Sequence, residues 1–240
     1  MGDYADFINK SDKRFDSSIL APWLFTPEAF RDLAKAQVDR VLELLTPIAS
    51  KCLGLVCGNH ESWIQQRYER DVYGEIVRGI REAGAFKEDD RLAFGYEGWL
   101  VLRFYRGCEA GARGNKNQTG DSTSVRIRLH HGYVGGRLAG AKALEMQRFL
   151  WTNDCHVAVL GHSHNLSVQP EEVQGLTAQG RLVCQVRKGC YSGTFLRTRI
   201  ENEPSTYSAV KGYLPLPVGH PTITIFPFTD QPFDLVKITA

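Results

Sequence analysis

Residues 55–62 read Leu55-Val56-Cys57-Gly58-Asn59-His60-Glu61-Ser62, and this stretch guides the interpretation of the whole chain. A short apolar run stops at a glycine, and an amide, an imidazole and a carboxylate follow at once. In α/β folds, catalytic and binding residues lie in loops at the carboxyl ends of strands. The stretch therefore predicts a buried strand over residues 51–57, a turn that carries ligands or catalytic groups, and a helix after it.

The sequence on either side alternates between helical and strand-like patterns. A helix over residues 26–49 is expected to begin with a Thr26 cap and a first-turn proline, and a second over residues 61–83 to end at Gly84. A third helix is expected at about 136–152. Further strands are expected at 91–94 and 99–104 as a hairpin, and at 125–129, 156–160, 182–186, 205–210 and 222–226. The pattern predicts a single α/β domain over residues 1–240.

Bulk composition sets broad limits on function. The 240 residues are 42% hydrophobic and 23% charged, and their net charge is +2. A net charge this small does not by itself indicate a nucleic acid or an anionic membrane as partner. No apolar run approaches the roughly 18 residues of a spanning helix, so no membrane partner is expected. The cysteines are scattered without a Cys-x-x-Cys pair. Scattered thiols are typical of a reducing compartment, so we expect a cytoplasmic location.

Polar clusters follow three of the expected strands. They are Asn59-His60, His130-His131 and His162-x-His164, and they contain five of the seven histidines. A further pair of acids, Asp3 and Asp6, lies at the start of the chain. Each cluster alone is modest evidence, but their joint occurrence after successive strands argues for one shared site.

The residue types in these clusters favour metal-assisted hydrolysis. Imidazole, amide oxygen and carboxylate together suit Mn²⁺, Fe or Zn²⁺. Two such ions about 3.5–4 Å apart can clamp a phosphoryl group and lower the pKa of a bridging water. A carboxylate with two oxygens is a natural bridge between them. An imidazole beside the ligands, itself unbound, can protonate the leaving oxygen.

As an ordered set, the motifs resemble those of the calcineurin-like metallophosphoesterases. The matching segments are Gly2-Asp3-x-x-Asp6, Gly58-Asn59-His60-Glu61, His131-Gly132 and Gly161-His162-x-His164. Two later segments, Gly193-Thr194-Phe195-Leu196 and Lys211-Gly212-Tyr213-Leu214-Pro215, are similar to segments of phage and bacterial members. The resemblance implies a four-layer β-sandwich flanked by helices, with the site on loops at the strand ends.

The resemblance also implies roles for the metal ligands. Asp3 would bridge two divalent ions. Asn59, His131 and His162 would complete one site, and His164 would bind the other ion. Mn²⁺ is the expected metal, with Fe, Zn²⁺, Ni²⁺ and Mg²⁺ as alternatives.

Two further residues would act without binding metal. His60 would be the leaving-group acid, and Asp6 would orient the ligands. The implied reaction is hydrolysis of a phosphomonoester or phosphodiester through a metal-bound hydroxide. A nucleotide or nucleic acid is among the substrates that such a site could take.

One departure from the family pattern alters these expectations. The family's first strand ends in Asp-x-His, whose two side chains bind metal, and no such motif precedes Gly2-Asp3. We therefore expect the first strand to be missing, by truncation or in a one-sided site. One ion would be bound firmly and a second more weakly. The exposed sheet position favours a homo-oligomer. The alternative function is a catalytically impaired remnant that binds metal or phosphate.

Several residues keep more than one interpretation. His130 could replace His131 as the ligand, although strand alternation places His131 with Val125, Ile127 and Leu129 on one face. His156 is expected to be a core or edge histidine, and His220 a turn residue.

Basic and aromatic side chains outside the motifs are also open to two interpretations. Arg14, and Arg113 with Lys116 in a polar loop, could contact substrate phosphate or simply face solvent. Trp63, Trp99 and Trp151 are expected to be packing residues rather than platforms for a base.

Overall fold

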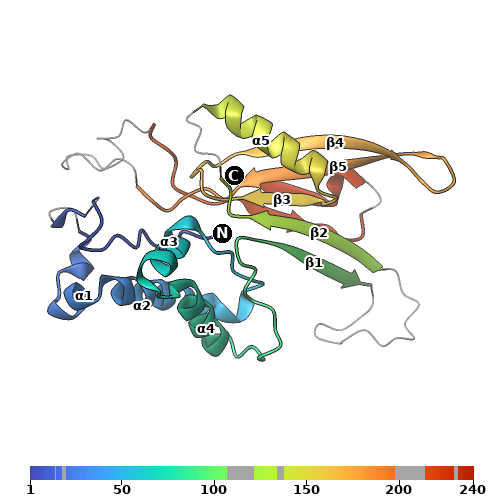
Figure 1. Cartoon of the computed structure of the whole chain (residues 1–240). Coiled ribbons are helices and arrows are strands. Elements are labelled where there is room, and N and C mark those ends of the chain that lie inside the picture. The colour runs from blue at the N-terminus through green and yellow to red at the C-terminus, as the bar shows by residue number, and fades with distance from the viewer. Residues whose placement is uncertain (14, 18–19, 107–121, 134–137, 198–213, 230–231) are drawn as a thin grey trace.

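The computed structural model describes the chain apart from residues 14, 18–19, 107–121, 134–137, 198–213 and 230–231. Within that part the chain forms α-helices, short 3-10 helices and two β-sheets (Figure 1). The α-helices are α1 (Pro27–Arg31), α2 (Leu33–Leu45), α3 (Asn59–Tyr68), α4 (Val72–Ala83) and α5 (Ala139–Thr152). The 3-10 helices are η2 (Pro22–Leu24), η3 (Thr46–Lys51) and η4 (Pro232–Asp234). The strands are β1 (Glu97–Tyr105), β2 (Ser122–His130), β3 (Val157–Leu160), β4 (Val168–Leu176), β5 (Leu182–Tyr191), β6 (Thr222–Ile225) and β7 (Val236–Thr239).

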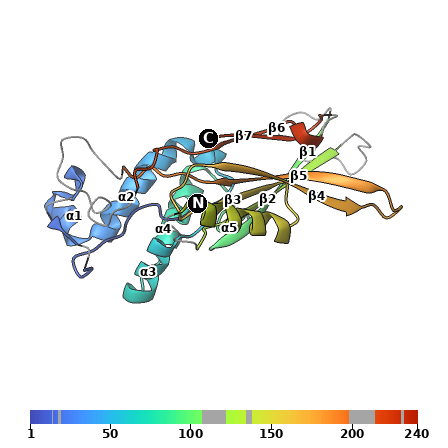
Figure 2. The same ribbon diagram turned by 90° about the horizontal axis from the view of Figure 1, so that it is seen from above.

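The larger sheet has five strands in the order β1-β2-β3-β5-β4. Strands β2, β3 and β5 run parallel at its centre, and β1 and β4 pair antiparallel at its two edges. Helix α5 covers one face, and the two-stranded β6–β7 sheet lies on the other (Figure 2). The expected α/β class is confirmed as a mixed sheet flanked by helices.

Side-chain alternation explains why both faces of the sheet are covered. On the face toward β6–β7, Val125, Ile127 and Val159 form a core with Val236. On the opposite face, apolar side chains of the sheet pack against Met146 and Leu150 of α5. All four residues of β3 are buried, as expected for a central parallel strand covered on both faces.

Helices α2, α3 and α4 build a separate core beside the carboxyl ends of β2 and β3 (Figure 1). Val38, Ile64, Ile76 and Ile80 are its central side chains, and each is at most 3% exposed. Leu55 packs among them. The segment after Leu55 thus leaves the helical core and meets the end of the sheet, where the polar clusters lie.

Both long helices predicted near the N-terminus are broken in the structure. The predicted helix over residues 26–49 begins at its Thr26 cap but stops at Asp32, whose carboxylate accepts from Lys35 N and starts α2. The helix over residues 61–83 is interrupted at Glu69, which has a left-handed φ of 54°. Asp71 then caps α4, and α4 ends at Gly84 as predicted. Local capping therefore overrides a continuous apolar pattern.

The predicted strand at residues 51–57 and the predicted hairpin at 91–104 are wrong. Leu55 forms only an isolated parallel bridge with Ala93. Strand β1 pairs with β2 along its whole length instead of folding back on residues 91–94. This pairing buries Leu100, Leu102 and Phe104 against the β6–β7 side of the sheet. The other predicted strands match β2, β3, β5 and β6, whereas β4 and β7 were not predicted and residues 205–210 lie outside the described part.

Two of the three tryptophans expected to pack inside are exposed. Trp99 is 44% exposed and Trp151 59% exposed. The guanidinium of Arg128 lies 5.3 Å from the centre of the Trp99 ring, so this tryptophan is held by a cation–π contact at the surface. Among the described residues, no helix is long and apolar enough to cross a membrane.

Candidate metal centre

Four side chains from distant segments meet at the carboxyl ends of β2 and β3. Asn59 Oδ1 lies 3.0 Å from His131 Nε2 and 2.8 Å from His162 Nδ1. Asp3 Oδ2 lies 3.3 Å from His131 Nε2 and 4.0 Å from His162 Nδ1. Asp3, His131 and His162 each offer a ligand atom within 4.8 Å of the others. We call these four residues, Asp3, Asn59, His131 and His162, the ligand cluster.

The fold explains why these residues converge. His131 directly follows β2, and His162 follows β3 after one glycine. These strands are parallel neighbours, so their carboxyl ends share one edge of the sheet. Asn59 is the first residue of α3, which comes from the helical core. Asp3 lies on the N-terminal segment, whose start Figure 1 places between the helices and the sheet end.

The hydrogen bonds of His131 define how its ring faces the ligand cluster. His131 Nδ1 lies 2.8 Å from the carbonyl oxygen of Met1, which can only accept, so Nδ1 carries the hydrogen. In the neutral ring, Nε2 then has a lone pair directed at the oxygens of Asn59 and Asp3. Three electron-rich atoms facing one another need a positive charge between them. The arrangement fits a divalent cation, which prefers such nitrogen and oxygen ligands.

In the absence of a cation, Asp3 and His131 stabilise one another as an ion pair. Burial alone would raise the pKa of Asp3, but the hydrogen bond and charge of His131 lower it to about 2. For His131, burial lowers the pKa, but the hydrogen bond and charge of Asp3, the contact with the Met1 backbone and the charge of Glu61 together outweigh it, and the net direction is upward. Burial lowers the pKa of His162. That shift favours the neutral ring, which is the form that binds metal.

Glu61 joins the two loops that carry Asp3 and Asn59, although it was not among the predicted site residues. Its carboxylate is 1% exposed. It accepts from Asp3 N at 2.9 Å, Tyr4 N at 2.8 Å and Gly58 N at 2.7 Å. Burial raises the pKa of Glu61, while these backbone donors act to lower it. The signal was present in the sequence, because a glutamate three residues after a helix cap is typical of a capping box.

Asp3 in turn supports the helix that carries Asn59. Its Oδ1 accepts from His60 N at 3.0 Å, in the first turn of α3. The two loops are therefore tied in both directions, by Glu61 and by Asp3. This mutual bracing leaves Asp3 Oδ2 as the oxygen that faces the ligand cluster.

The backbone is close-packed where these loops cross. Gly2 has a φ of 81°, and a Cβ there would lie 2.6 Å from Gly58 N. A Cβ on Gly58 would lie 2.2 Å from Asp3 Oδ1 and 2.3 Å from Asp3 N. The glycines beside the ligands thus permit an approach that no other residue allows. Asp3, His162 and His164 also have left-handed φ values of 52°, 62° and 56°.

We expect Gly58→Ala to destabilise the fold and to weaken metal binding. The new methyl would push Asp3 away, and overpacking of this kind costs about 1–3 kcal/mol of unfolding free energy. Gly140→Ala is the matched control, because a Cβ there meets nothing within 4 Å. It lies in α5 and should be neutral or slightly stabilising. Urea unfolding measures the stability of the two variants. Equal unfolding midpoints would contradict the close approach of Gly58 to Asp3.

His60 lies beside the ligand cluster. Its Nδ1 is 2.7 Å from the carbonyl oxygen of Asp6, so Nδ1 carries the hydrogen and Nε2 remains for another partner. This contact joins the backbone of Asp6 to His60, which is not one of the predicted ligands. The described contacts give its carboxylate no hydrogen bond to the ligand cluster.

His164 and His130 lie outside the ligand cluster. His164 Nδ1 is 3.5 Å from Thr194 Oγ1, and its nitrogens do not join the mutually close group. His130 Nδ1 accepts from Gly132 N at 2.7 Å, and its ring packs against Phe149. The structure therefore places His131, not His130, in the cluster.

The chain contains one Asp-x-His, Asp154-Cys155-His156, which the sequence prediction did not consider. It precedes β3 and so lies at the opposite end of that strand from His162. Asp154 pairs with Arg126 and Arg187, and His156 Nδ1 accepts from Arg126 N. These contacts stabilise the sheet and contribute nothing to the ligand cluster. His156 is thus a half-buried histidine at the start of the central strand, with its hydrogen bonds satisfied by β2 and β5.

Three basic residues that were left open between a substrate contact and a solvent-facing position, Arg14, Arg113 and Lys116, lie outside the described residues. His220 Nδ1 contacts the carbonyl oxygen of Pro221, in keeping with a turn residue. Comparison of the chain with models of known protein families, with curated proteins and with solved structures found no match.

Proposed function

We propose that the chain is a metal-dependent phosphoesterase of the calcineurin-like metallophosphoesterase type. The observation that carries this proposal is the convergence of Asp3, Asn59, His131 and His162, with His60 beside them. Four segments separated in the sequence supply one carboxylate, one amide oxygen and two imidazoles to a single point. Oxygen and imidazole ligands that converge in this way suit a divalent cation.

The residues present fit a divalent cation such as Mn²⁺. The ligand cluster would hold it through Asp3 Oδ2, Asn59 Oδ1, His131 Nε2 and His162 Nδ1. The bound cation would supply positive charge that polarises a phosphoryl oxygen and lowers the pKa of a water molecule. The Met1 carbonyl fixes the tautomer of His131, and Glu61 holds the two loops in register. His164, with Asp3, remains the proposed partial site for a second, weaker ion.

His60 is the proposed proton donor to the leaving oxygen. The Asp6 carbonyl holds its Nδ1–H, so the ring presents Nε2 toward the cavity beside the ligand cluster. In the proposed reaction, water oxygen bonds to phosphorus as the bond to the leaving oxygen breaks. The doubly protonated His60 ring gives its Nε2 proton to that oxygen and keeps the hydrogen on Nδ1. The proton lost by the water later returns to Nε2. General acid catalysis of this kind contributes about 10²–10⁴-fold.

The architecture supports the family assignment beyond the motifs. A mixed five-stranded sheet with a second sheet on one face and a helix on the other resembles the sandwich that the family uses. The ligand cluster lies on loops at the strand ends, where the family places its site. We propose the sandwich as the finer fold of this chain.

Hydrolysis of bis-p-nitrophenyl phosphate with added Mn²⁺ tests the proposed function. His60→Asn keeps a donor for the Asp6 carbonyl but removes Nε2. We expect it to lower kcat for a dinucleotide by about 10²–10⁴-fold, with a smaller loss for the nitrophenyl ester, whose leaving anion is stable without a proton. Mn²⁺ affinity should not change. His220→Asn is the matched control, and equal losses on both substrates would contradict the acid role.

A metal-binding remnant without turnover is the second candidate. It is favoured by the position of His164 outside the ligand cluster and of Asp154-Cys155-His156 at the far end of β3. A protein that binds Mn²⁺ through Asn59, loses that binding in Asn59→Ala, and hydrolyses no phosphate ester would establish this reading instead.

A further inference from the structure

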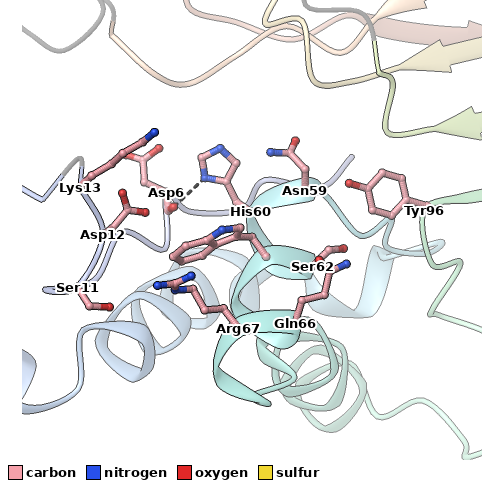
Figure 3. A pocket seen from close by; sticks show the side chains of 11 residues that line it. Asp6, Ser11, Asp12, Lys13, Asn59, His60, Ser62, Gln66, Arg67 and Tyr96 are labelled. Carbon is pink, nitrogen blue, oxygen red and sulfur yellow. Dashed lines mark hydrogen bonds between the residues drawn. The ribbon is translucent and has the colours of Figure 1, made fainter.

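A cavity of about 750 Å³ opens beside His60 and follows one face of α3 (Figure 3). Asn59, Ser62, Trp63, Gln66 and Arg67 line it from that helix. They recur at helical spacing, so they share one side of α3. The helix that presents the ligand Asn59 and the proton donor therefore also forms a wall of the cavity.

The size of this cavity indicates what it holds. Arg67 lies seven positions after His60, which is a rise of about 10 Å along the helix. Pockets of about 300–1,000 Å³ accommodate whole organic ligands, so a phosphate group alone would fill only one end. If the proposed function holds, the leaving oxygen faces His60. The group attached to that oxygen then extends into the cavity.

The cavity carries two cationic side chains. Arg67 and Lys13 both line it and both are exposed. Neither has a carboxylate partner among the described residues, whereas Arg70, in the segment between α3 and α4, is paired with Asp32 and Glu75. Guanidinium and ammonium groups left without a protein anion suit a phosphate.

Aromatic and acidic side chains restrict the ligand further. Trp63 is half-buried against the helical core and lines the cavity, with the Arg67 guanidinium 5.8 Å from its ring centre. Flat aromatic rings stack on nucleic-acid bases. Asp6 and Asp12 line the same cavity, so its two cations and two anions balance. A long polyanion is therefore disfavoured, and a ligand with one additional phosphate is favoured.

We propose that this cavity binds the leaving nucleotide of a short phosphodiester, with its base at Trp63 and its terminal phosphate at Arg67 and Lys13. This proposal rests on the phosphoesterase function and narrows its substrate class to dinucleotides. Hydrolysis adds water across the diester. The hydroxyl joins the phosphorus, and the nucleotide leaves as an alcohol that takes the proton from His60.

A binding titration tests the cavity without depending on turnover. Thymidine 3′,5′-bisphosphate, a leaving-group mimic, is titrated into the protein in the presence of EDTA and followed by tryptophan fluorescence. We expect saturable binding that Arg67→Gln weakens about tenfold, as loss of one charge-assisted contact implies. Arg78→Gln, an exposed arginine on α4 outside the cavity, should bind as the wild type does. Absence of binding, or equal affinities for all three proteins, would overturn the proposal.

A kinetic comparison extends the test to the reaction. The wild type should have a kcat/KM about tenfold higher for a thymidine dinucleotide with terminal phosphates than for one without. Arg67→Gln should abolish that preference, whereas Arg78→Gln should keep it and leave bis-p-nitrophenyl phosphate hydrolysis unchanged. A single-stranded 20-mer that is cleaved better than the dinucleotide would contradict the limit to short substrates. Failure to hydrolyse any ester would overturn the proposed function, while the titration would still decide the ligand of the cavity.

Discussion

Asp3→Asn should reduce Mn²⁺ affinity by more than about 100-fold while the protein stays folded. Mutation of a residue that only supports a metal ligand already lowers metal affinity by about 10–100-fold. Asp3 supplies the one carboxylate of the ligand cluster itself, so a larger loss is expected. An asparagine keeps the Oδ1 atom that accepts from His60 N, so the first turn of α3 remains capped. The amide that replaces Oδ2 can donate to His131 Nε2. The substitution thus removes the charge and preserves the local contacts.

Isothermal titration with Mn²⁺ measures this loss, and thermal unfolding provides a second reading. At 100 times its Kd, a ligand stabilises the folded state by about 2.7 kcal/mol, so Mn²⁺ should raise the melting temperature of the wild type and not that of Asp3→Asn. Asp39→Asn is the control, because this exposed carboxylate lies on α2 and, within the described part of the chain, pairs only with Lys35. A variant at Asp3 that still binds Mn²⁺ as tightly as the wild type would show that the ion is held elsewhere.

Glu61→Gln should lower the unfolding free energy by about 2–5 kcal/mol, because buried donors left without an acceptor cost about 1–3 kcal/mol each. The carboxylate accepts three backbone N–H groups, two of them at Oε2. A glutamine presents an NH₂ group in place of one oxygen, so either orientation places donors against donors. Released loops would also displace Asp3, and Mn²⁺ affinity should fall by about 10–100-fold.

Glu145 offers the same substitution in a contrasting environment. It is 7% exposed, and its Oε2 accepts from Tyr191 Oη at 2.7 Å. Its Oε1 has no partner among the described residues. Glu145→Gln should therefore change stability by less than about 1 kcal/mol. Similar losses for both variants in urea unfolding would mean that burial alone, rather than the three backbone donors, accounts for the effect at Glu61.

The sequence predicted those parts of the structure that depend on nearby residues. The Thr26 cap, the end of α4 at Gly84, and the central strands β2 and β3 follow from local pattern. The meeting of His131 and His162 was expected, because the loops after parallel strands share one edge of a sheet, whereas Asn59 reaches the same place from the helical core.

Features decided by distant contacts were not predictable in this way. The turn residues at 95–98 favour a hairpin, yet β1 pairs with β2, since burial of Leu100 and Phe104 depends on strands more than 100 residues later. The break at Asp32 also involves Arg70, which pairs with that carboxylate from the segment between α3 and α4. The exclusion of His164 from the ligand cluster depends on a backbone conformation that its neighbours in sequence do not reveal.

The left-handed backbone at Asp3, His162 and His164 has a consequence for protein engineering. Most residues other than glycine, asparagine and aspartate lose about 1–2 kcal/mol of stability in this conformation, so glycine or asparagine would be more stable than histidine at 162 and 164. A redesign that optimised only thermal stability would replace these histidines first. The product would be a more stable protein that had lost side chains of the proposed metal centre.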